Sequence, residues 1–369
     1  MVSQWGEDEE QTEAVEMCSR KVVMQKQCIR CHRFTTLANT HRKTAFLSNK
    51  SDLAARWGLL HSIRRGFQPR KVARSSKRLA PVPEVDAVGT GGFSCLIRPL
   101  GFTVMVTACS FGVAAIWQYE SLRKIVQQAN CKKNERIDHF GKAGSFRQRM
   151  NRWWTSVSPG RKVVVSIIAA NTFVFLMWRV RSLQPFMLKW FTSNPMSAAP
   201  CTSMLLSSFS HYSLMHLFVN MYVLWSFAPT ITQLLGPEQF TAMYLSAGVV
   251  SAFASYIHRV AIRSLIPSVG ASGSIIAVLG AVCYFYPNAH LSIALIGDII
   301  PHSFSASSAM YGMITFDALG VLLRWRFFDH AAHLGGIFFG IWYLAYGHQL
   351  IWKNREPFMK FWHDLRGRP

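Results

Sequence analysis

Seven apolar runs with almost no charge constrain the fold of this chain more than any other feature. Each is close to the roughly 20 residues that a helix needs to cross about 30 Å of hydrocarbon. Proline, glycine and clusters of charge separate them, as is typical of connections between helices. The pattern predicts an all-α polytopic membrane protein. The runs are residues 99–118, 163–178, 212–227, 240–257, 269–286, 304–323 and 331–346.

The first run stands apart from a compact set of six, which predicts a one-plus-six arrangement of spans. Ahead of it, residues 20–78 are rich in Arg and Lys and contain one acid, Asp52. That composition is typical of a mitochondrial transit peptide. The expected segments are a leader at 1–80, a linker at 81–98, an extra span at 99–118, a basic hydrophilic loop at 119–162, a six-helix core at 163–348 and a tail at 349–369.

The basic charge of the chain does not indicate a nucleic-acid partner. Lys and Arg outnumber Asp and Glu by 40 to 18, but they avoid the apolar runs and gather in the first half. They are better explained as targeting and membrane-flanking charge. The eight cysteines are scattered and imply no disulfide framework. Cys28, Cys31 and His32 match a haem-attachment spacing, but they lie in the leader without an apolar pocket, so we interpret the match as a coincidence.

Polar residues suited to acyl transfer lie near the starts of three runs of the compact set. Ser272 is near the start of the fourth run, and His333 is near the start of the sixth. Because helices that alternate in direction return parallel at every second member, both lie on one side of the membrane. His216 and Asn220, in the first turns of the second run, lie on that side too. A hydroxyl and an imidazole there predict a nucleophile and its general base.

Small residues at helical spacing predict a close contact between the fourth and sixth runs. Such residues let helix backbones approach in a membrane, where bulky side chains would hold them apart. Without that approach Ser272 and His333 would stay outside hydrogen-bond distance. The small residues are Gly273, Ala277 and Ala281 in the fourth run and Gly335, Gly336 and Gly340 in the sixth.

Three motifs in this order resemble the rhomboid family of intramembrane serine proteases, and the leader and first span resemble its mitochondrial members. The likeness runs from about residue 99 to the C-terminus. The motifs are His211-x4-His216-x3-Asn220, then Gly270-Ala271-Ser272-Gly273, then Ala332-His333-Leu334-Gly335-Gly336.

The resemblance implies a Ser272–His333 dyad without metal or cofactor. It also implies that His216 and Asn220, with the Ser272 N–H, stabilise the oxyanion, and that Gly270 forms the tight turn before the nucleophile. The implied substrates are single-span or otherwise transmembrane-anchored proteins, met within the lipid of the inner mitochondrial membrane and cut within or next to it.

The sequence departs from the family pattern at two positions. Many rhomboids have a tyrosine four residues after the nucleophile that stacks on the histidine, and Ile276 stands there in this chain. The Trp-Arg pair of the first loop is also absent, because Trp190 is followed by Phe191. The group that orients the histidine is therefore not given by the resemblance.

Several polar residues have an alternative interpretation. Asp329 is expected to cap the last core helix rather than complete a triad, and His211 to tie the first loop to the second core helix. Asp317 is an acid within a span, and pairing it with Asp298 would give an aspartyl protease. That pairing leaves the serine and histidine unexplained. The stretch at 290–300 is expected to be interfacial or re-entrant.

Three other classes of function fit the sequence less well than a protease does. A zinc protease needs His-Glu-x-x-His, which the sequence lacks. A transporter would use broken helices and internal repeats, and the six core runs show no inverted repeat. A catalytically inactive rhomboid that binds membrane helices is the closest alternative, and the presence of both dyad residues argues against it.

Overall fold

The computed structural model describes residues 93–132, 145–264, 266–292 and 303–367. Some of the predictions above therefore concern positions outside the described residues: the leader at 1–80, residues 81–92 of the linker, the Cys28–Cys31 pair and Asp298.

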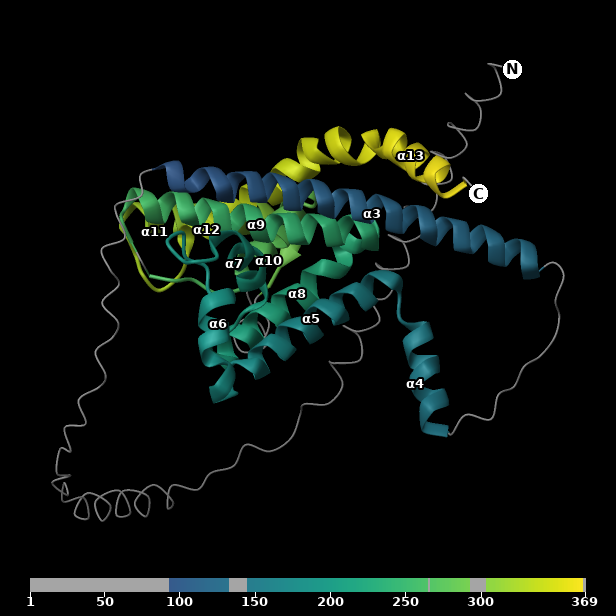
Figure 1. Cartoon of the computed structure of the whole chain (residues 1–369), viewed down its shortest axis with the longest axis horizontal. Coiled ribbons are helices and arrows are strands. Elements are labelled where there is room, and N and C mark those ends of the chain that lie inside the picture. Colours follow the sequence, from purple (N-terminus) through teal and green to yellow (C-terminus); the bar gives the residue numbers. More distant parts are fainter. Residues whose placement is uncertain (1–92, 133–144, 265, 293–302, 368–369) are drawn as a thin grey trace, which may run out of the picture. The chain divides into compact units, whose positions relative to one another are not determined.

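Each of the seven apolar runs is a helix, so the all-α prediction is confirmed. The last of them continues beyond Trp342 as a π-helix, Tyr343–Trp352. The seven helices, in the order of the chain, are α3 Ile97–Lys132, α5 Pro159–Met177, α8 Leu214–Leu235, α9 Pro237–Ala261, α10 Ser272–Phe285, α11 Ala306–Leu322 and α12 His330–Trp342 (Figure 1).

Shorter elements fill the connections and the C-terminal end. They are the 3-10 helices Phe93–Leu96, Arg181–Leu183, Ser207–Phe209 and Lys353–Arg355, the helices α4 Ser145–Ser156, α6 Gln184–Trp190, α7 Pro200–Leu206 and α13 Glu356–Gly367, and the strands β1 His290–Leu291 and β2 Phe304–Ser305.

Local sequence explains where the core helices begin. Ser158, Ser213 and Ser305 each accept a hydrogen bond from a backbone N–H in the first turn of the helix that follows. These caps satisfy donors that have no partner within the helix. Gly236, with φ of 83°, separates α8 from α9 and permits a turn that a larger residue resists.

The core helices differ in length more than the apolar runs predicted. Among the described residues, α3, α5, α8 and α9 are long and apolar enough to cross a membrane, whereas α10 and α11 are shorter apolar helices. The 14 residues of α10 rise only about 21 Å, so α10 alone does not cross about 30 Å of hydrocarbon. The expectation that every run is close to a full span was wrong for this helix.

Two segments predicted to be a loop and a tail contain helices. Helix α3 runs 14 residues past position 118, and both α4 and α13 are helical. Residues 119–132 are polar but contain neither Pro nor Gly, and most are good helix formers. The loss of apolar character therefore marks where the helix leaves the hydrocarbon, and the helix itself continues.

The predicted re-entrant stretch at 290–300 begins as a strand. His290 pairs with Ser305 and Leu291 with Phe304 in a two-stranded antiparallel sheet between α10 and α11. Residues 293–302 lie outside the described residues, so the rest of that expectation stays a prediction.

The polar end of α3 contacts α13, the last helix of the chain. Tyr119 Oη lies 2.6 Å from His363 Nδ1, and Trp362 Nε1 donates to Glu120 at 3.2 Å. Glu120 also forms an ion pair with Arg366. These contacts put the end of the first span and the end of the chain on one side. The seven crossings predicted from the sequence would give the same arrangement, because an even number of spans would separate the two points.

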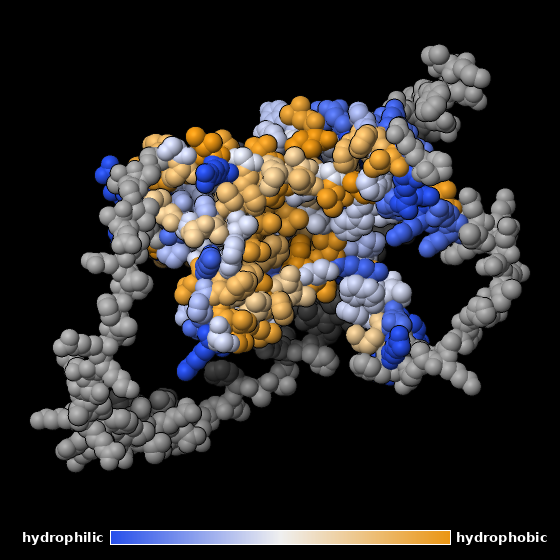
Figure 2. Space-filling view, in the orientation of Figure 1, coloured by the Kyte–Doolittle hydropathy of each residue, from blue (hydrophilic) through white to orange (hydrophobic). Residues whose placement is uncertain are grey.

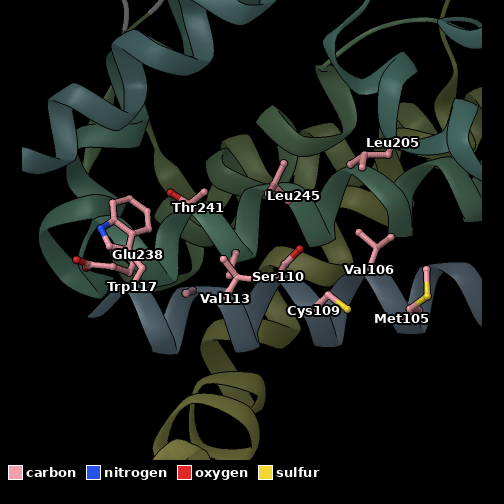
Figure 3. A pocket seen from close by; sticks show the side chains of 12 residues that line it. Met105, Val106, Cys109, Ser110, Val113, Trp117, Leu205, Glu238, Thr241 and Leu245 are labelled. Atoms are coloured by element: carbon pink, nitrogen blue, oxygen red, sulfur yellow. The ribbon is translucent and has the colours of Figure 1, made fainter. Parts of the chain in front are cut away.

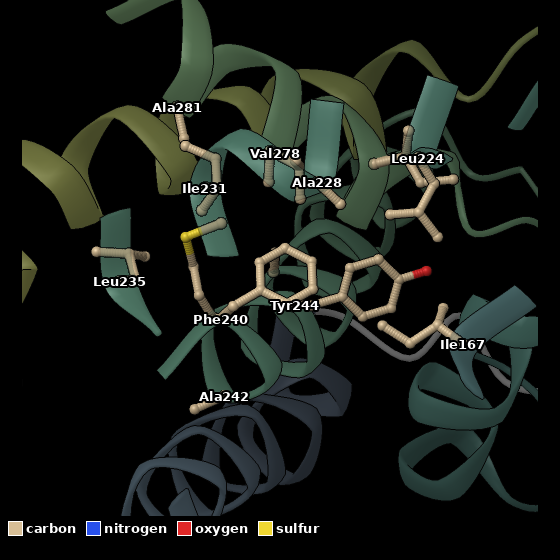
Figure 4. Close-up of a cluster of buried hydrophobic side chains, with 14 of the residues drawn as sticks. Ile167, Leu224, Ala228, Ile231, Leu235, Phe240, Ala242, Tyr244, Val278 and Ala281 are labelled. Atoms are coloured by element: carbon tan, nitrogen blue, oxygen red, sulfur yellow. The ribbon is translucent and has the colours of Figure 1, made fainter. Parts of the chain in front are cut away.

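The buried core lies where α5, α8, α9 and α10 meet. Leu224 and Ile231 of α8 pack with Phe240 and Tyr244 of α9 and with Val278 of α10 (Figure 4). All five side chains are fully buried. Burial of this apolar cluster fixes the four helices as one packed unit.

The outer surface of the helices is apolar as well. Figure 2 shows hydrophobic residues across the helices, whereas hydrophilic residues gather on α4 and near the ends of α3 and α13. Soluble proteins rarely expose apolar patches of this extent, so the surface suits lipid. Outward-facing apolar side chains include Val104, Phe173, Phe218, Trp225, Leu322 and Tyr346.

A groove of about 320 Å³ lies between α3, α7 and α9 (Figure 3). Met105, Val113 and Trp117 line it from α3, and Leu205 and Leu245 line it from the core. The extra helix therefore packs against the six-helix core without filling all the space between them.

Glycines bring α10 and α12 into backbone contact. A Cβ on Gly336 would overlap the Gly273 carbonyl oxygen, and a Cβ on Gly340 would overlap the Ala277 carbonyl oxygen. A Cβ on Gly335 would meet Ala254 of α9. The predicted close approach of the fourth and sixth core helices is thus present, and no side chain separates them at these two levels.

Gly340→Ala should destabilise the protein, because the new methyl group collides with the Ala277 backbone. Overpacking typically lowers the free energy of unfolding by roughly 1–3 kcal/mol. Gly312→Ala in α11 is the matched control, since nothing lies within 4 Å of its added Cβ. Thermal unfolding in detergent should show a lower midpoint for Gly340→Ala than for the unaltered protein, and no lowering of the midpoint for Gly312→Ala. Equal midpoints for the two variants would contradict this account of the helix contact.

Candidate active site

The backbone before α10 holds Ser272 at the first position of that helix. Ser193 and Ser268 exchange two backbone hydrogen bonds of 2.8 and 2.9 Å, and the Gly270 N–H donates to the Ser207 carbonyl oxygen at 3.1 Å. Gly270 has φ of 140°, and a Cβ there would lie 2.9 Å from the His216 ring. Only glycine suits this position, because both the backbone conformation and the space exclude a side chain.

Ser272 and His333 are within hydrogen-bond distance. His333 Nε2 lies 3.0 Å from Ser272 Oγ, across the contact between α12 and α10. His333 is 9% exposed, so it is shielded from bulk water. A hydroxyl and an imidazole nitrogen at this separation are close enough for a proton to pass between them.

His216 and Asn220 lie beside this pair on α8, with His211 behind them. Asn220 Nδ2 donates to His211 Nε2 at 2.9 Å, and the His211 and His216 rings meet edge to face at 5.0 Å. Burial, together with the neighbouring His216, lowers the pKa of His211 to about 3. His211 therefore stays neutral, and it links the loop before α8 to that helix as predicted.

Asp329 caps α12, as the sequence predicts. Its Oδ1 accepts from the Ala332 N–H at 3.2 Å. Its Oδ2 accepts from Arg259 Nη2 at 2.9 Å and from Ser255 Oγ at 2.6 Å. Burial alone would raise the pKa of Asp329. The Arg259 charge and these hydrogen bonds outweigh that effect, so the net pKa lies below its usual value. The carboxylate thus fixes the start of the helix that carries His333, at a distance from the histidine ring.

Asp317 of α11, in contrast, contacts His333 directly. Its Oδ1 lies 3.2 Å from His333 Nδ1 and 2.6 Å from Nδ1 of His330. Asp317 is 3% exposed. This acid was noted from the sequence and its pairing with Asp298 was set aside, but a contact with either imidazole was not predicted.

A small polar cavity opens next to Ser272. It measures about 30 Å³ and is lined mainly by serines and by the backbone around Ser272. A water molecule needs roughly 10–15 Å³ and two to four polar partners, and this cavity offers both. The serines are Ser193, Ser207, Ser208, Ser251 and Ser268.

Known proteins match the chain over the part that contains these residues. The family model described as Rhomboid domain matches residues 200–350. Presenilin-associated rhomboid-like protein, mitochondrial, of Homo sapiens is 47% identical over 342 residues, 88% of this chain and 89% of its own length. The Bos taurus protein of that name is 50% identical over 312 residues, 82% of each chain. The chain belongs to the rhomboid family.

A more distant rhomboid supports the same assignment. Rhomboid protein 1, mitochondrial, of Saccharomyces cerevisiae is 30% identical over 198 residues, 53% of this chain and 56% of its own length. All three relatives carry the word mitochondrial in their names. With the apolar helices, this makes the rhomboid described here a mitochondrial membrane protein.

Sequence reasoning missed how this rhomboid holds its histidine. The contact of Asp317 with His333 was not predicted, although a signal for it existed. Consecutive helices joined by a short turn are antiparallel, so residues near the end of α11 face residues near the start of α12. The Arg259–Asp329 pair was also missed, because no spacing rule joins residues of α9 and α12.

Arg259→Met should destabilise the start of α12, because it leaves the partly buried Asp329 carboxylate without its cationic partner. Breaking one partner of a buried pair costs on the order of 3 kcal/mol. The double variant Arg259→Met with Asp329→Asn should recover part of that loss, since no charge is then left unpaired. Unfolding midpoints of the two single variants and the double variant measure the coupling. Strictly additive losses would argue against a coupled pair.

Proposed function

We propose that this rhomboid is an intramembrane serine endopeptidase that uses a Ser272–His333 dyad. The observation that carries the proposal is the 3.0 Å separation of His333 Nε2 and Ser272 Oγ in a site enclosed by apolar helices. A general base must reach the proton that it removes, and this pair satisfies that condition without substrate. The chemistry needs neither a metal ion nor an organic cofactor.

In the first half of the reaction Ser272 forms an acyl-enzyme. His333 Nε2 takes the proton from Oγ as the oxygen attacks the scissile carbonyl carbon. The resulting imidazolium gives that proton to the leaving amine, and the peptide bond breaks. Helix α12 holds the imidazole for both transfers.

Donors for the developing oxyanion lie on the side of Ser272 that faces α8. The Ser272 N–H is one of the first amides of α10, and such amides have no partner within the helix. Asn220 Nδ2 uses one hydrogen for His211 and has a second one free to donate. His216 flanks Ser272 across Gly270, where no side chain intervenes.

Hydrolysis of the acyl-enzyme requires water at a site surrounded by lipid. The serine-lined cavity beside Ser272 is a place where such a water can be held. His333 Nε2 would remove a proton from this water as its oxygen attacks the acyl carbon. The imidazolium would then return that proton to Ser272 Oγ as the bond between the acyl carbon and Oγ breaks. The cavity therefore supports hydrolysis rather than transfer of the acyl group to another acceptor.

The substrates we propose are single-span or transmembrane-anchored proteins of the inner mitochondrial membrane. The apolar outer surface keeps the site within lipid, so a substrate arrives as a membrane segment. A helical backbone has its carbonyls hydrogen-bonded and its scissile bond covered by side chains. Cleavage therefore requires local unwinding, which favours segments with a weak helix near the membrane face.

Ser272→Ala and His333→Ala should each abolish cleavage of a single-span reporter in liposomes. Loss of a member of such a unit reduces turnover by on the order of 10⁴-fold or more. A serine-directed phosphonate should label the unaltered protein but not Ser272→Ala. Ser274→Ala is the matched control. This buried serine lies two residues after Ser272 on α10, and its Oγ has no hydrogen-bond partner among the described residues. Normal turnover in Ser272→Ala would refute the protease and favour a helix-binding role.

Asn220→Ala and His216→Ala should slow turnover more than they weaken substrate binding. Removal of one oxyanion donor lowers kcat by roughly 10²–10³-fold in other serine proteases, and the Ser272 N–H softens the loss. Ser226→Ala on α8 is the control, since its hydroxyl donates to the Tyr222 carbonyl oxygen of its own helix. A rise in KM with unchanged kcat would instead assign the two residues to binding or packing.

A further inference from the structure

One carboxylate oxygen of Asp317 serves two imidazoles. Oδ1 lies 2.6 Å from His330 Nδ1 and 3.2 Å from His333 Nδ1. All three side chains are buried, so water does not compete for these contacts. A carboxylate oxygen only accepts, and therefore both Nδ1 atoms must carry hydrogen.

This arrangement selects one tautomer of His333. With hydrogen on Nδ1, the neutral ring presents a lone pair on Nε2, and that atom faces Ser272 Oγ at 3.0 Å. The other tautomer would place an N–H against the serine and could not accept its proton. The contact to Asp317 thus sets both the direction of the ring and its ability to act as a base.

We propose that Asp317 is a positioning residue for catalysis, which extends the dyad to a Ser272–His333–Asp317 array. The proposal rests on the serine protease function proposed above. During acylation the serine proton moves to His333 Nε2, and Asp317 keeps its negative charge and stabilises the imidazolium. The proton never moves to the carboxylate.

His330 holds Asp317 in place for this role. It is 3% exposed, and the rings of Phe316, Trp325 and Phe327 surround it at centroid distances of 5.4, 5.8 and 5.3 Å. A Cβ on Gly320 would overlap the His330 ring, so the backbone of α11 packs directly against it. An imidazole confined in this way fixes the carboxylate oxygen that it binds, and His333 then meets an acceptor at a defined position.

Asp317 also accounts for the residue that departs from the family pattern. Ile276 occupies the position from which a tyrosine stacks on the histidine in many rhomboids. Among the described residues two rings lie near His333: Phe328, with ring centroids 6.0 Å apart and planes tilted by 37°, and His330, at 6.4 Å and 76°. Neither forms a close parallel stack. A hydrogen bond from the Nδ1 side therefore replaces ring stacking as the constraint on His333.

The test is the steady-state cleavage of a single-span reporter by Asp317→Asn in liposomes. The amide has the shape of the carboxylate but lacks its charge, and its N–H₂ group favours the wrong histidine tautomer. We expect kcat to fall by on the order of 10²–10⁴-fold with KM nearly unchanged. Asp317→Glu should retain more activity than Asp317→Asn, because it keeps the charge at a displaced position.

Gln239→Met is the control for a purely structural loss. Gln239 is buried and lies 2.7 Å from both Tyr343 Oη and His348 Nδ1, so the variant removes a comparable buried network away from the dyad. It should lower the unfolding midpoint without a fall in kcat. A fall in kcat for Asp317→Asn no larger than that for Gln239→Met, at equal folded fraction, would overturn the proposal.

Failure of this proposal and failure of the protease function give different results. If the unaltered protein cleaves the reporter and Asp317→Asn keeps its kcat, only the role of Asp317 is wrong. If the unaltered protein and Ser272→Ala are equally inactive, the protease function fails and this proposal fails with it. If Asp317→Asn does not fold, the kcat values of Asp317→Glu and His330→Phe test the proposal instead. The first variant moves the carboxylate oxygen, and the second removes the imidazole that holds it. Unchanged kcat in both would overturn the proposal.

Discussion

The backbone contact between α10 and α12 is the constraint on which the site depends. Gly336 lies against the Gly273 carbonyl and Gly340 against the Ala277 carbonyl, so the two helices approach without intervening side chains. Hydrocarbon supplies little hydrophobic drive for helices to associate, and close van der Waals packing takes its place. The 3.0 Å contact of Ser272 and His333 follows from this approach, because both residues lie near the start of their helices.

Much of the fold could be predicted from the sequence because a bilayer permits few alternatives. Backbone polar groups in hydrocarbon must be satisfied within a helix, so a long apolar run is sufficient evidence for one. The same argument gave the parallel direction of α8, α10 and α12 and placed their polar residues on one side. It failed where the chain leaves the hydrocarbon. Residues 119–132 and α13 are helical for reasons of propensity and contact that apolar length does not report.

The sequence motifs of the candidate site were predictable, but the side-chain contacts between residues of different helices were not. Ser272 and His333 stand in recognisable surroundings, whereas the partners of an isolated acid depend on the rotation of its helix. Asp317 was recognised as an unusual intramembrane carboxylate, yet sequence alone did not show that it faces α12. Likewise the Asn220–His211 bond joins a helix to a loop whose path no periodicity describes. Long-range side-chain pairing is the information that the structure adds.

The unequal lengths of the helices have a consequence for the surrounding lipid. Helix α9 has 25 residues and rises about 37 Å, whereas α11 has 17 and rises about 25 Å. Tyr311, Leu319 and Leu322 of α11 face outward, so lipid beside this helix meets a shorter apolar column. A bilayer accommodates such hydrophobic mismatch by thinning locally. A membrane helix that diffuses up to α11 would then have part of a turn in the headgroup layer, where water competes for its backbone hydrogen bonds.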